Sequence, residues 1–365
     1  MIKIDLITGF LGAGKTTFIR KYAKYLMNSG KNIGILENDF GAVNVDMMML
    51  QDLMGDQCEL EMISGGCDPE THRRRFKTKL ISMGMCGYDR ILVEPSGIFD
   101  VDEFFDILHE EPLDRWYAPG SVITIVDANL EEEMSEEENY ILASEAASAG
   151  KIVFSKIGKN LKTEKETEMA KGESATRESR EISMVLAHIN MALKQIKCKR
   201  VIQKEDCLCK SWDELTETDF QDLMSVGYTP ENYQKLDFEQ DSVFESLYFL
   251  NKKITVENMK KAAEELFQNP DCGHIFRIKG FLNTSYKEEI MTENKMADET
   301  KKANGAKTEK MGFWEEFNAT RENISIQPVK EGQEVLIMIG AGLKQEKIEE
   351  CLEKYCTYCT EGFEK

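Results

Sequence analysis

The sequence predicts an α/β protein in which a doubly wound domain with a mostly parallel sheet precedes a small α+β domain. In the first part of the chain, short apolar runs alternate with helical stretches, and residues 91–93, 122–126 and 152–154 are mostly apolar at consecutive positions. Strands of a parallel sheet that helices cover on both faces require this pattern. After residue 241 strands outnumber helices, which is typical of an α+β domain.

The elements expected in the first domain, residues 1–226, follow from this alternation. Strands are expected at 2–8, 32–36, 88–94, 120–128, 151–156 and 200–203. Helices are expected at 16–27, 70–82, 100–110, 137–149 and 182–197. Gly30 is the expected C-cap of the first helix. Residues 37–69 are rich in loop residues, and the polar residues 157–181 predict an exposed helical or loose excursion.

The second domain, residues 242–365, is expected to follow a linker at 227–241. Its strands are expected at 242–250, 274–282, 313–320, 323–327 and 334–340, and its helices at 255–267 and 344–355. Thr255 is the expected N-cap of the first of these helices. The polar stretch 287–310 predicts a mobile loop between strands.

The composition limits the partners. The 365 residues carry 46 basic and 66 acidic side chains, a formal net charge of -20, which disfavours nucleic acid and anionic membranes. Apolar runs long enough to span a bilayer, about 18 residues, are absent from the sequence. The ten cysteines lack the regular spacing of a secreted disulfide framework, so reduced thiols and a cytoplasmic location are expected.

The stretch "GFLGAGKTT", residues 9–17, is a phosphate-binding motif between the first expected strand and helix. Glycines let backbone N–H groups surround a phosphate without a Cβ in the way. The lysine bridges the β- and γ-phosphates, and the hydroxyl that follows it ligates Mg²⁺. The predicted nucleotide-binding residues of this P-loop are Gly9, Gly12, Ala13, Gly14, Lys15, Thr16 and Thr17.

A P-loop also needs an acid at the end of a neighbouring strand to hold the Mg²⁺ shell. The stretch "ILVEPSG" supplies Glu94 at a strand end, and Gly97 would approach a γ-phosphate. Together with Lys15, this acid predicts a P-loop nucleoside triphosphatase that uses Mg²⁺.

The chain resembles the CobW-type GTPases of the CobW/HypB/UreG group, P-loop proteins of the SIMIBI class that serve metal centres. The motifs that carry the resemblance run in family order through both domains. They are "GFLGAGKTT" (9–17), "ENDFGAVNVD" (37–46), "VEPSG" (93–97), "SVITIVDA" (121–128), "FSK" (154–156), "RIKGFL" (277–282) and "IGAGLKQEKIEECL" (339–352). The last two lie in the C-terminal domain that separates CobW-like proteins from HypB and UreG.

The resemblance assigns two further elements. The family's switch falls on Asn38, Asp39, Phe40 and Gly41, and it places Asp39 near Mg²⁺ or the γ-phosphate, with Asp46 close behind. The expected catalytic residues are therefore Lys15, Asp39 and Glu94, and the expected Mg²⁺ ligands are Thr16, Asp39 and Glu94.

The base-recognition element departs from the family pattern. It reads Ser155, Lys156, Ile157, Gly158, where the family has aspartate in the last position. Ser155 and Lys156 are still expected to bind the nucleotide. The missing carboxylate would accept hydrogen bonds from guanine and discriminate against adenine by a few kcal/mol. GTP is the expected substrate, and ATP stays open.

The family's Cys-x-Cys-Cys metal motif is reduced to Cys67 in "GGCDPE". One thiolate is not the soft, closed set that retains zinc. Either Cys67, Glu70 and His72 form a harder mixed site, or Cys67 is a small buried residue and Pro69 starts the next helix. The basic residues 72–75 form a solvated helix face or an anion-binding patch.

Other cysteines have chelating spacings, namely Cys207 with Cys209 and Cys356 with Cys359, and Cys272, His274 and Cys351 also lie in the second half. The resemblance implies a nucleotide-gated chaperone whose client is a metalloprotein or a corrinoid-dependent protein. Two alternatives are an adaptor without metal cargo and a metal carrier that uses these C-terminal cysteines. The transition metal is undetermined.

Overall fold

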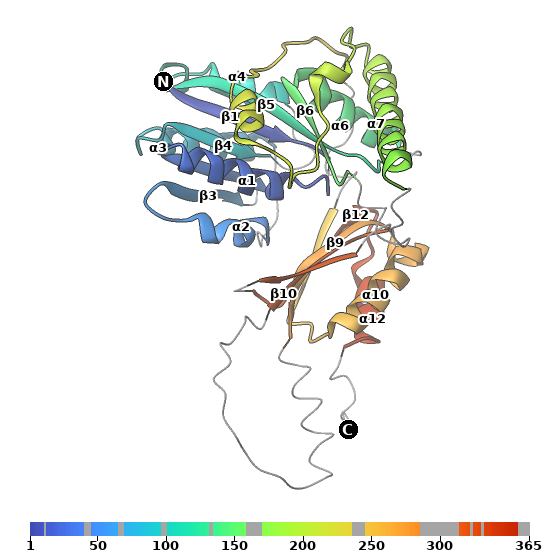
Figure 1. Cartoon of the computed structure of the whole chain (residues 1–365). Coiled ribbons are helices and arrows are strands. Elements are labelled where there is room, and N and C mark those ends of the chain that lie inside the picture. The colour runs from blue at the N-terminus through green and yellow to red at the C-terminus, as the bar shows by residue number, and fades with distance from the viewer. Residues whose placement is uncertain are drawn as a thin grey trace, which may run out of the picture. The chain divides into compact units, whose positions relative to one another are not determined.

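A computed structural model of the chain describes residues 1–10, 12–39, 45–64, 69–95, 101–130, 134–157, 170–235, 245–284, 314–321, 324–329 and 332–356. The chain divides into two compact units, Met1–Phe238 and Glu239–Lys365 (Figure 1). Several residues named above lie outside the described part, namely Phe40, Gly41, Cys67, Gly97, Gly158, Cys359 and the loop 287–310. The side chains of Asp39, Asp46 and Glu70 also lie outside it.

The first unit is built on a seven-stranded sheet of order β3-β2-β4-β1-β5-β6-β7, in which every pair is parallel. This order reverses direction on either side of β1 and confirms the predicted doubly wound fold. The strands are β1 (Ile2–Thr8), β2 (Ile33–Asp39), β3 (Cys58–Ser64), β4 (Arg90–Glu94), β5 (Tyr117–Asp127), β6 (Lys151–Ser155) and β7 (Cys207–Leu208).

Helices cover both faces of this sheet. They are α1 (Lys15–Asn28), α2 (Val45–Leu50), α3 (Pro69–Met83), α4 (Val101–Leu108), α5 (Leu113–Trp116), α6 (Glu136–Ser148), α7 (Ala170–Gln195) and α8 (Glu217–Leu223), with 3₁₀ turns at Gln51–Leu53 and Lys204–Asp206. On β4, Leu92 packs with α1 and α8, whereas Ile91 and Val93 pack with α3 and α4 on the other face. Burial on both faces explains why these strands are apolar at consecutive positions.

Three parts of the first unit differ from the sequence prediction. Residues expected as a loop contain α2 and β3, and α7 starts at Ala170, well before residue 182. The expected strand at 200–203 is wrong, since the last strand of the sheet is β7. The side chain of Asn190 on α7 binds both the N–H and the carbonyl oxygen of Ile202, at 2.8 and 3.0 Å, so this backbone pairs with a side chain and not with a strand.

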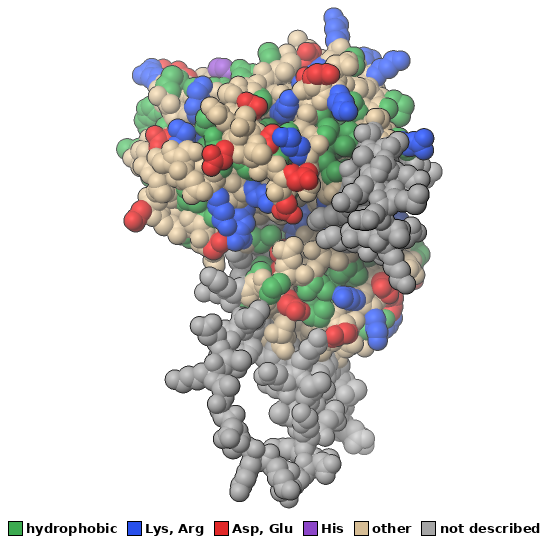
Figure 2. All heavy atoms as spheres, in the orientation of Figure 1, with side chains coloured by type: hydrophobic (Ala, Val, Ile, Leu, Met, Phe, Trp, Pro, Cys, Tyr) green, Lys and Arg blue, Asp and Glu red, His purple; other side chains and the backbone are tan. Residues whose placement is uncertain are grey.

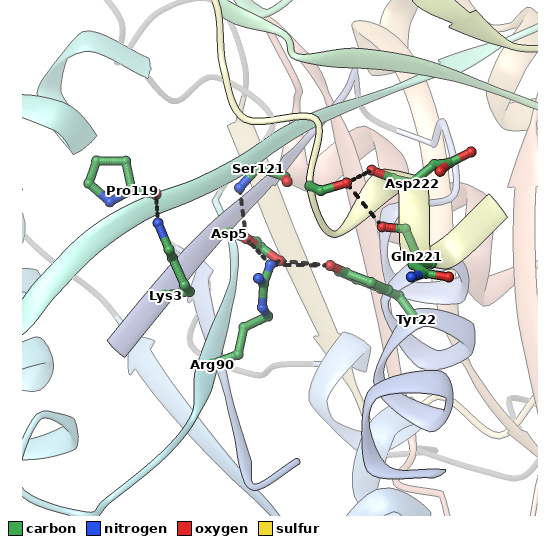
Figure 3. Close-up of polar contacts among 9 residues, drawn as sticks. Lys3, Asp5, Tyr22, Arg90, Pro119, Ser121, Gln221 and Asp222 are labelled. Carbon is green, nitrogen blue, oxygen red and sulfur yellow. Dashed lines mark hydrogen bonds and ion pairs between the residues drawn. The ribbon is translucent and has the colours of Figure 1, made fainter. Parts of the chain in front are cut away.

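A buried charged network lies on β1 and β4 (Figure 3). Arg90 donates to both carboxylate oxygens of Asp5, at 2.5 and 2.7 Å, and the hydroxyl of Tyr22 and the N–H of Ser121 donate to the same carboxylate. A Cβ on Gly120 would lie 2.0 Å from an Asp5 oxygen, so only glycine leaves room for this acid. Desolvation raises the pKa of Asp5, and the charge of Arg90 opposes this rise.

Residues after α8 stay attached to the first unit. The N–H of Val122 donates to Gly227, that of Thr229 donates to Ser148, and that of Gln234 donates to Ile196. The stretch 227–234, which the sequence indicates as the start of a linker, is therefore hydrogen-bonded to the first unit.

The described residues of the second unit form a five-stranded antiparallel sheet of order β11-β10-β9-β12-β8, with two helices. Its elements are β8 (Glu245–Leu250), α10 (Val256–Gln268), a 3₁₀ turn (Pro270–Cys272), β9 (His274–Asn283), β10 (Trp314–Thr320), β11 (Ile324–Val329), β12 (Val335–Ala341) and α12 (Gln345–Glu353). Apolar side chains of α10, α12 and the sheet form one core. The predicted α+β class is confirmed, and Thr255 caps α10 by accepting the N–H of Asn258.

In Figure 2, acidic and basic side chains alternate over the visible face of the first unit. This face therefore presents mixed charge and not a basic surface of the kind that binds nucleic acid. Within the described ranges, every helix is too short or too polar to cross a membrane.

Candidate nucleotide site

The loop between β1 and α1 has a backbone that only glycine adopts readily. Gly9 has a φ of 141°, and a Cβ there would lie 2.3 Å from the carbonyl oxygen of Ile125 on β5. Gly14 has a φ of 102°, in the left-handed region, and a Cβ there would lie 3.0 Å from the ring of Trp212. Gly12 also has a positive φ, and the N–H of Ala13 donates to Phe10 across a turn. The motif thus lies between a strand and a helix, as the sequence predicts.

The lysine and the threonine of the motif are buried beside this loop. Lys15 is 8% exposed, and its Nζ donates to the carbonyl oxygen of Gly9 at 2.8 Å. Thr16 is 7% exposed and its hydroxyl donates to Glu94 Oε1 at 3.1 Å. Thr17 lies in the first turn of α1, where N–H groups and the helix dipole favour an anion. The structure therefore brings together Lys15, Thr16 and Glu94.

Two carboxylates end neighbouring strands at this edge of the sheet. Glu94 is the last residue of β4, is 5% exposed and is paired in register with Glu37 on β2, which is 3% exposed. Sequence reasoning missed Glu37. The signal was present, because Glu37 follows an apolar strand just as Glu94 does. The backbone of Asp39 ends β2 at the same edge.

The predicted base-binding residues lie at the end of β6. Ser155 is its last residue, and its hydroxyl donates to Val126 at 3.3 Å. Lys156 has a φ of 56°, and its ammonium pairs with the carboxylate of Asp127, the last residue of β5. The same carboxylate accepts from the N–H of Asn129 at 2.9 Å. Asp127 therefore fixes the head group of Lys156, a role that the sequence did not indicate.

Trp212 connects the glycine loop to the end of β6. Its Nε1 donates to the carbonyl oxygen of Phe154 on β6 at 2.9 Å, and its ring lies against Gly14 and edge-on to Phe18. Sequence reasoning missed this residue, which lies far along the chain from both elements. The tryptophan holds the start of α1 and the end of β6 at a fixed spacing.

A family comparison agrees with this geometry. Residues 3–184, about half of the chain, match the family model described as "CobW/HypB/UreG, nucleotide-binding domain". The chain belongs to the CobW/HypB/UreG family through this domain. The family match starts in β1 and includes the glycine loop, β4 with Glu94, β6 with Lys156 directly after it, and the first half of α7.

Curated relatives of this CobW/HypB/UreG domain are named zinc chaperones. Zinc chaperone YjiA of Escherichia coli (strain K12) is 31% identical over 169 residues, 42% of this chain and 49% of that protein. Zinc chaperone YeiR of the same organism is 30% identical over 159 residues, 43% and 47% of the two chains. Zinc chaperone CobW of Sinorhizobium sp is 32% identical over 134 residues, 35% and 37%. The chain thus spans half or less of the length of these relatives.

Solved structures are also similar. Zn(II)-bound YjiA GTPase from E. coli is 20% identical and covers 97% of this chain and 98% of that one, with a TM-score of 0.31. Hydrogenase maturation factor HypB from Archaeoglobus fulgidus is 18% identical over 48% and 75% of the two chains, with a TM-score of 0.31. TM-scores this low do not establish a common fold, which here follows from the strand order and the family match.

The reduced metal motif of this CobW/HypB/UreG domain is followed by α3. The helix begins at Pro69, which confirms the prediction that proline occupies its first position. His72 is buried, and burial, with Arg75 as a smaller cause, lowers its pKa. Arg73 and Lys77 both bind Glu110. The stretch 72–75 thus contains a buried histidine and an ion-paired arginine. It matches neither a fully solvated helix face nor a patch in which every basic side chain is available to an anion.

The described cysteines are thiols without a metal cluster around them. Within the described ranges, no group of three or more His, Cys, Asp or Glu side chains is arranged to hold a metal ion. Burial raises the pKa of Cys207 and of Cys351 to about 12, and also raises that of Cys272. Because metal ligation requires the thiolate, these environments disfavour it.

Proposed function

We propose that this protein binds a purine nucleoside triphosphate together with Mg²⁺ and hydrolyses it, with GTP as the preferred substrate. The observation that carries this proposal is the placement of Lys15 and of the Thr16–Glu94 hydrogen bond directly beside a strand-to-helix glycine loop. Such loops bind phosphate through backbone N–H groups and a helix N-terminus. The family match supports it, because the family domain is described as nucleotide-binding.

The residues at the mouth of the loop fit Mg²⁺, a hard cation that prefers oxygen ligands. Thr16 places its hydroxyl beside the carboxylate of Glu94, to which it donates at 3.1 Å, and a hydroxyl oxygen and a carboxylate are both ligands of the kind that this cation takes. Glu94, at the end of β4, would hold the hydration shell of Mg²⁺, and Asp39, at the end of β2, would be a further ligand of the ion. When bound, Mg²⁺ supplies neutralisation of the charge on the phosphate oxygens.

The chain's own residues would act by positioning and by charge. The loop from Gly9 to Thr17 would hold the β-phosphate through its amides, and Lys15 would neutralise the β- and γ-phosphate oxygens. Gly97, in the segment after Glu94, would approach the γ-phosphate. Water is the nucleophile. Turnover would be slow in the free protein and would rise when a client binds the segments that follow Asp39 and Glu94.

In the cell, we propose, this protein is a nucleotide-gated chaperone that inserts or activates a metal or corrinoid cofactor in a client protein. The zinc chaperones among its relatives support a role with metal centres. Delivery of free zinc is less favoured, since only Cys67 is left of the Cys-x-Cys-Cys motif. An adaptor without metal cargo and a carrier that uses C-terminal cysteines are the alternatives.

Calorimetric titration with GTP and with ATP, each with Mg²⁺, tests the nucleotide site. We expect binding of both and tighter binding of GTP. Lys15→Ala should abolish it, whereas Lys24→Ala, an exposed lysine on the same helix, should not. Absence of binding by the wild-type protein to either nucleotide would contradict the proposal. Steady phosphate release separates a hydrolase from an adaptor, which would bind without turnover.

A further inference from the structure

The indole of Trp212 contacts the glycine loop at one end and β6 at the other. A Cβ on Gly14 would lie 3.0 Å from the outer edge of its six-membered ring, and its Nε1 donates to the carbonyl oxygen of Phe154 at 2.9 Å. In the sheet, β5 lies between β6 and β1, the strand that leads into the loop. The tryptophan therefore joins two segments whose strands are not neighbours.

The segment that carries Trp212 is attached on both sides of the tryptophan. Lys210, two residues before it, pairs with Asp219 of α8 at 2.6 Å. Asp213, directly after it, pairs with Lys21 of α1 at 3.1 Å. Partly exposed pairs of this kind contribute little to stability one by one, but two of them on either side of one residue restrict where its side chain lies. The position of the ring is thus set before any ligand binds.

The part of the indole that stays exposed offers an apolar aromatic surface. Trp212 is half-buried and packs against the core around α1, where its ring centroid lies 5.9 Å from that of Phe18. Its one hydrogen-bonding group, the Nε1–H, is taken by Phe154. The ring can therefore contact a ligand only by packing. Packing on an aromatic ring tolerates any base, because every base has a π-face.

We propose that Trp212 binds the nucleoside part of the nucleotide by packing against it, and that this contact does not distinguish guanine from adenine. This inference rests on the nucleotide binding proposed above. With phosphates on the loop at Gly14 and a base beside Lys156, the nucleoside lies between these two places, and Trp212 contacts Gly14 and Phe154, two residues before Lys156. The tryptophan thus supplies affinity for the nucleoside in a site that lacks the family's base-reading aspartate.

The test compares Trp212→Ala with the wild type by calorimetry with Mg²⁺ and GTP, ATP or inorganic triphosphate. We expect the variant to bind GTP and ATP about tenfold more weakly, each by the same factor, because it loses the aromatic packing. Inorganic triphosphate has no nucleoside, so its affinity, measured by competition with GTP, should stay the same. Trp116→Ala, which removes a half-buried tryptophan of α5 that lies against Gly84, is the control and should leave all three affinities unchanged.

A second measurement does not need the alanine variant. The chain has three tryptophans, so Trp212 is the only one left in the double variant Trp116→Phe/Trp314→Phe. Saturating GTP or ATP with Mg²⁺ should lower the quenching of its fluorescence by acrylamide, since the nucleoside would cover the exposed part of the ring. This measurement decides the question if thermal melting shows that Trp212→Ala is unfolded.

The outcomes separate this inference from the proposed function. A folded Trp212→Ala that binds GTP as tightly as the wild type, or that loses GTP and ATP by clearly different factors, would overturn the inference alone. Equal weakening of inorganic triphosphate would also overturn it, because the tryptophan would then act through the loop and not on the nucleoside. Acrylamide quenching that nucleotide leaves unchanged has the same meaning. A wild type that binds no purine triphosphate would overturn the proposed function as well.

Discussion

Removal of Arg90 is the most direct test of the charges buried on β1 and β4. Arg90→Met keeps an unbranched stem of similar length but leaves the Asp5 carboxylate with two neutral donors, from Tyr22 and Ser121. The side chain of Asp5 is fully buried and that of Arg90 is 9% exposed, so solvent does not reach the carboxylate to replace the guanidinium. Breaking a buried pair by removing one partner costs about 3–5 kcal/mol.

The structure also sets a ceiling on this cost. Without the guanidinium, burial raises the pKa of Asp5 further, so the acid enters the folded state protonated. The cost is then the protonation of a carboxyl whose ordinary pKa is 3.8, which is about 4.4 kcal/mol at pH 7 and about 1.6 kcal/mol at pH 5. A raised folded pKa leaves stability intact below 3.8 and removes it as the pH rises.

We therefore expect Arg90→Met to lower the free energy of unfolding by about 3–4 kcal/mol at pH 7 and by roughly 1–2 kcal/mol at pH 5. Thermal melting of the variant and wild type at both pH values measures this, at about 2–4 °C per kcal/mol. Arg115→Met, which breaks the exposed pair with Glu111, is the control and should cost less than about 1 kcal/mol.

The stability lost in Arg90→Met should depend on pH only because Asp5 carries a charge. Adding Asp5→Asn to Arg90→Met removes the buried charge, so the double variant should show no extra loss of stability between pH 5 and 7. A loss for Arg90→Met that is equal at the two pH values would mean that Asp5 is not the group that titrates. The assignment of the cost to an uncompensated carboxylate would then be wrong.

Two further predictions concern the nucleotide site, and a third concerns Glu145, which is buried on α6. Gly9→Ala places a Cβ 2.3 Å from the backbone oxygen of Ile125 at a φ of 141°. We expect melting experiments to show a loss of about 1–3 kcal/mol in the free energy of unfolding, and we expect no measurable nucleotide binding. Gly87→Ala, which has open space around it, is the control and should keep nucleotide binding. Thr16→Val removes the hydroxyl bound to Glu94 and should weaken GTP binding about tenfold to a hundredfold with Mg²⁺ but little without it. Burial raises the pKa of Glu145 to about 7 from an ordinary 4.5, so the wild type should lose about 3 kcal/mol of stability between pH 4.5 and pH 8. Glu145→Gln should not show this loss when both proteins are melted across that pH range. The same pH dependence in the two proteins would contradict the prediction.

The conformation of the glycine loop could be predicted because its geometry is local. Residues 9–17 are contiguous, and the demand for glycine at Gly9 and Gly14 comes from backbone angles and from a close approach to β5 and Trp212. The cap at Thr255 was predictable for the same reason, since an N-cap involves residues three apart. A pattern that a few neighbouring residues complete is visible in the sequence.

Glu145 and Asn190 could not be predicted, because distant partners decide what they do. In the sequence, Glu145 is one of several acids in a helix, and only the fold buries it to 1% exposure. The residues 200–203 have the composition of a strand, but the amide of Asn190 takes the backbone groups of Ile202. β-propensity describes how well a residue fits a half-buried surface of a sheet. It does not account for a distant side chain that takes the backbone hydrogen bonds that a neighbouring strand would otherwise make.

The two ends of the proposed site also differ in what a single substitution changes. At the base end, the Asp127–Lys156 pair and the Trp212–Phe154 hydrogen bond fix the end of β6 whatever residue stands at position 158. The missing carboxylate there would have contributed one charge-assisted interaction, worth about 1.5–3 kcal/mol. The proposed phosphate binding would instead draw on several loop amides, Lys15 and Mg²⁺. Because selectivity is a difference between two affinities, we expect glycine at position 158 to reduce the preference for guanine while leaving most of the affinity for any purine triphosphate in place.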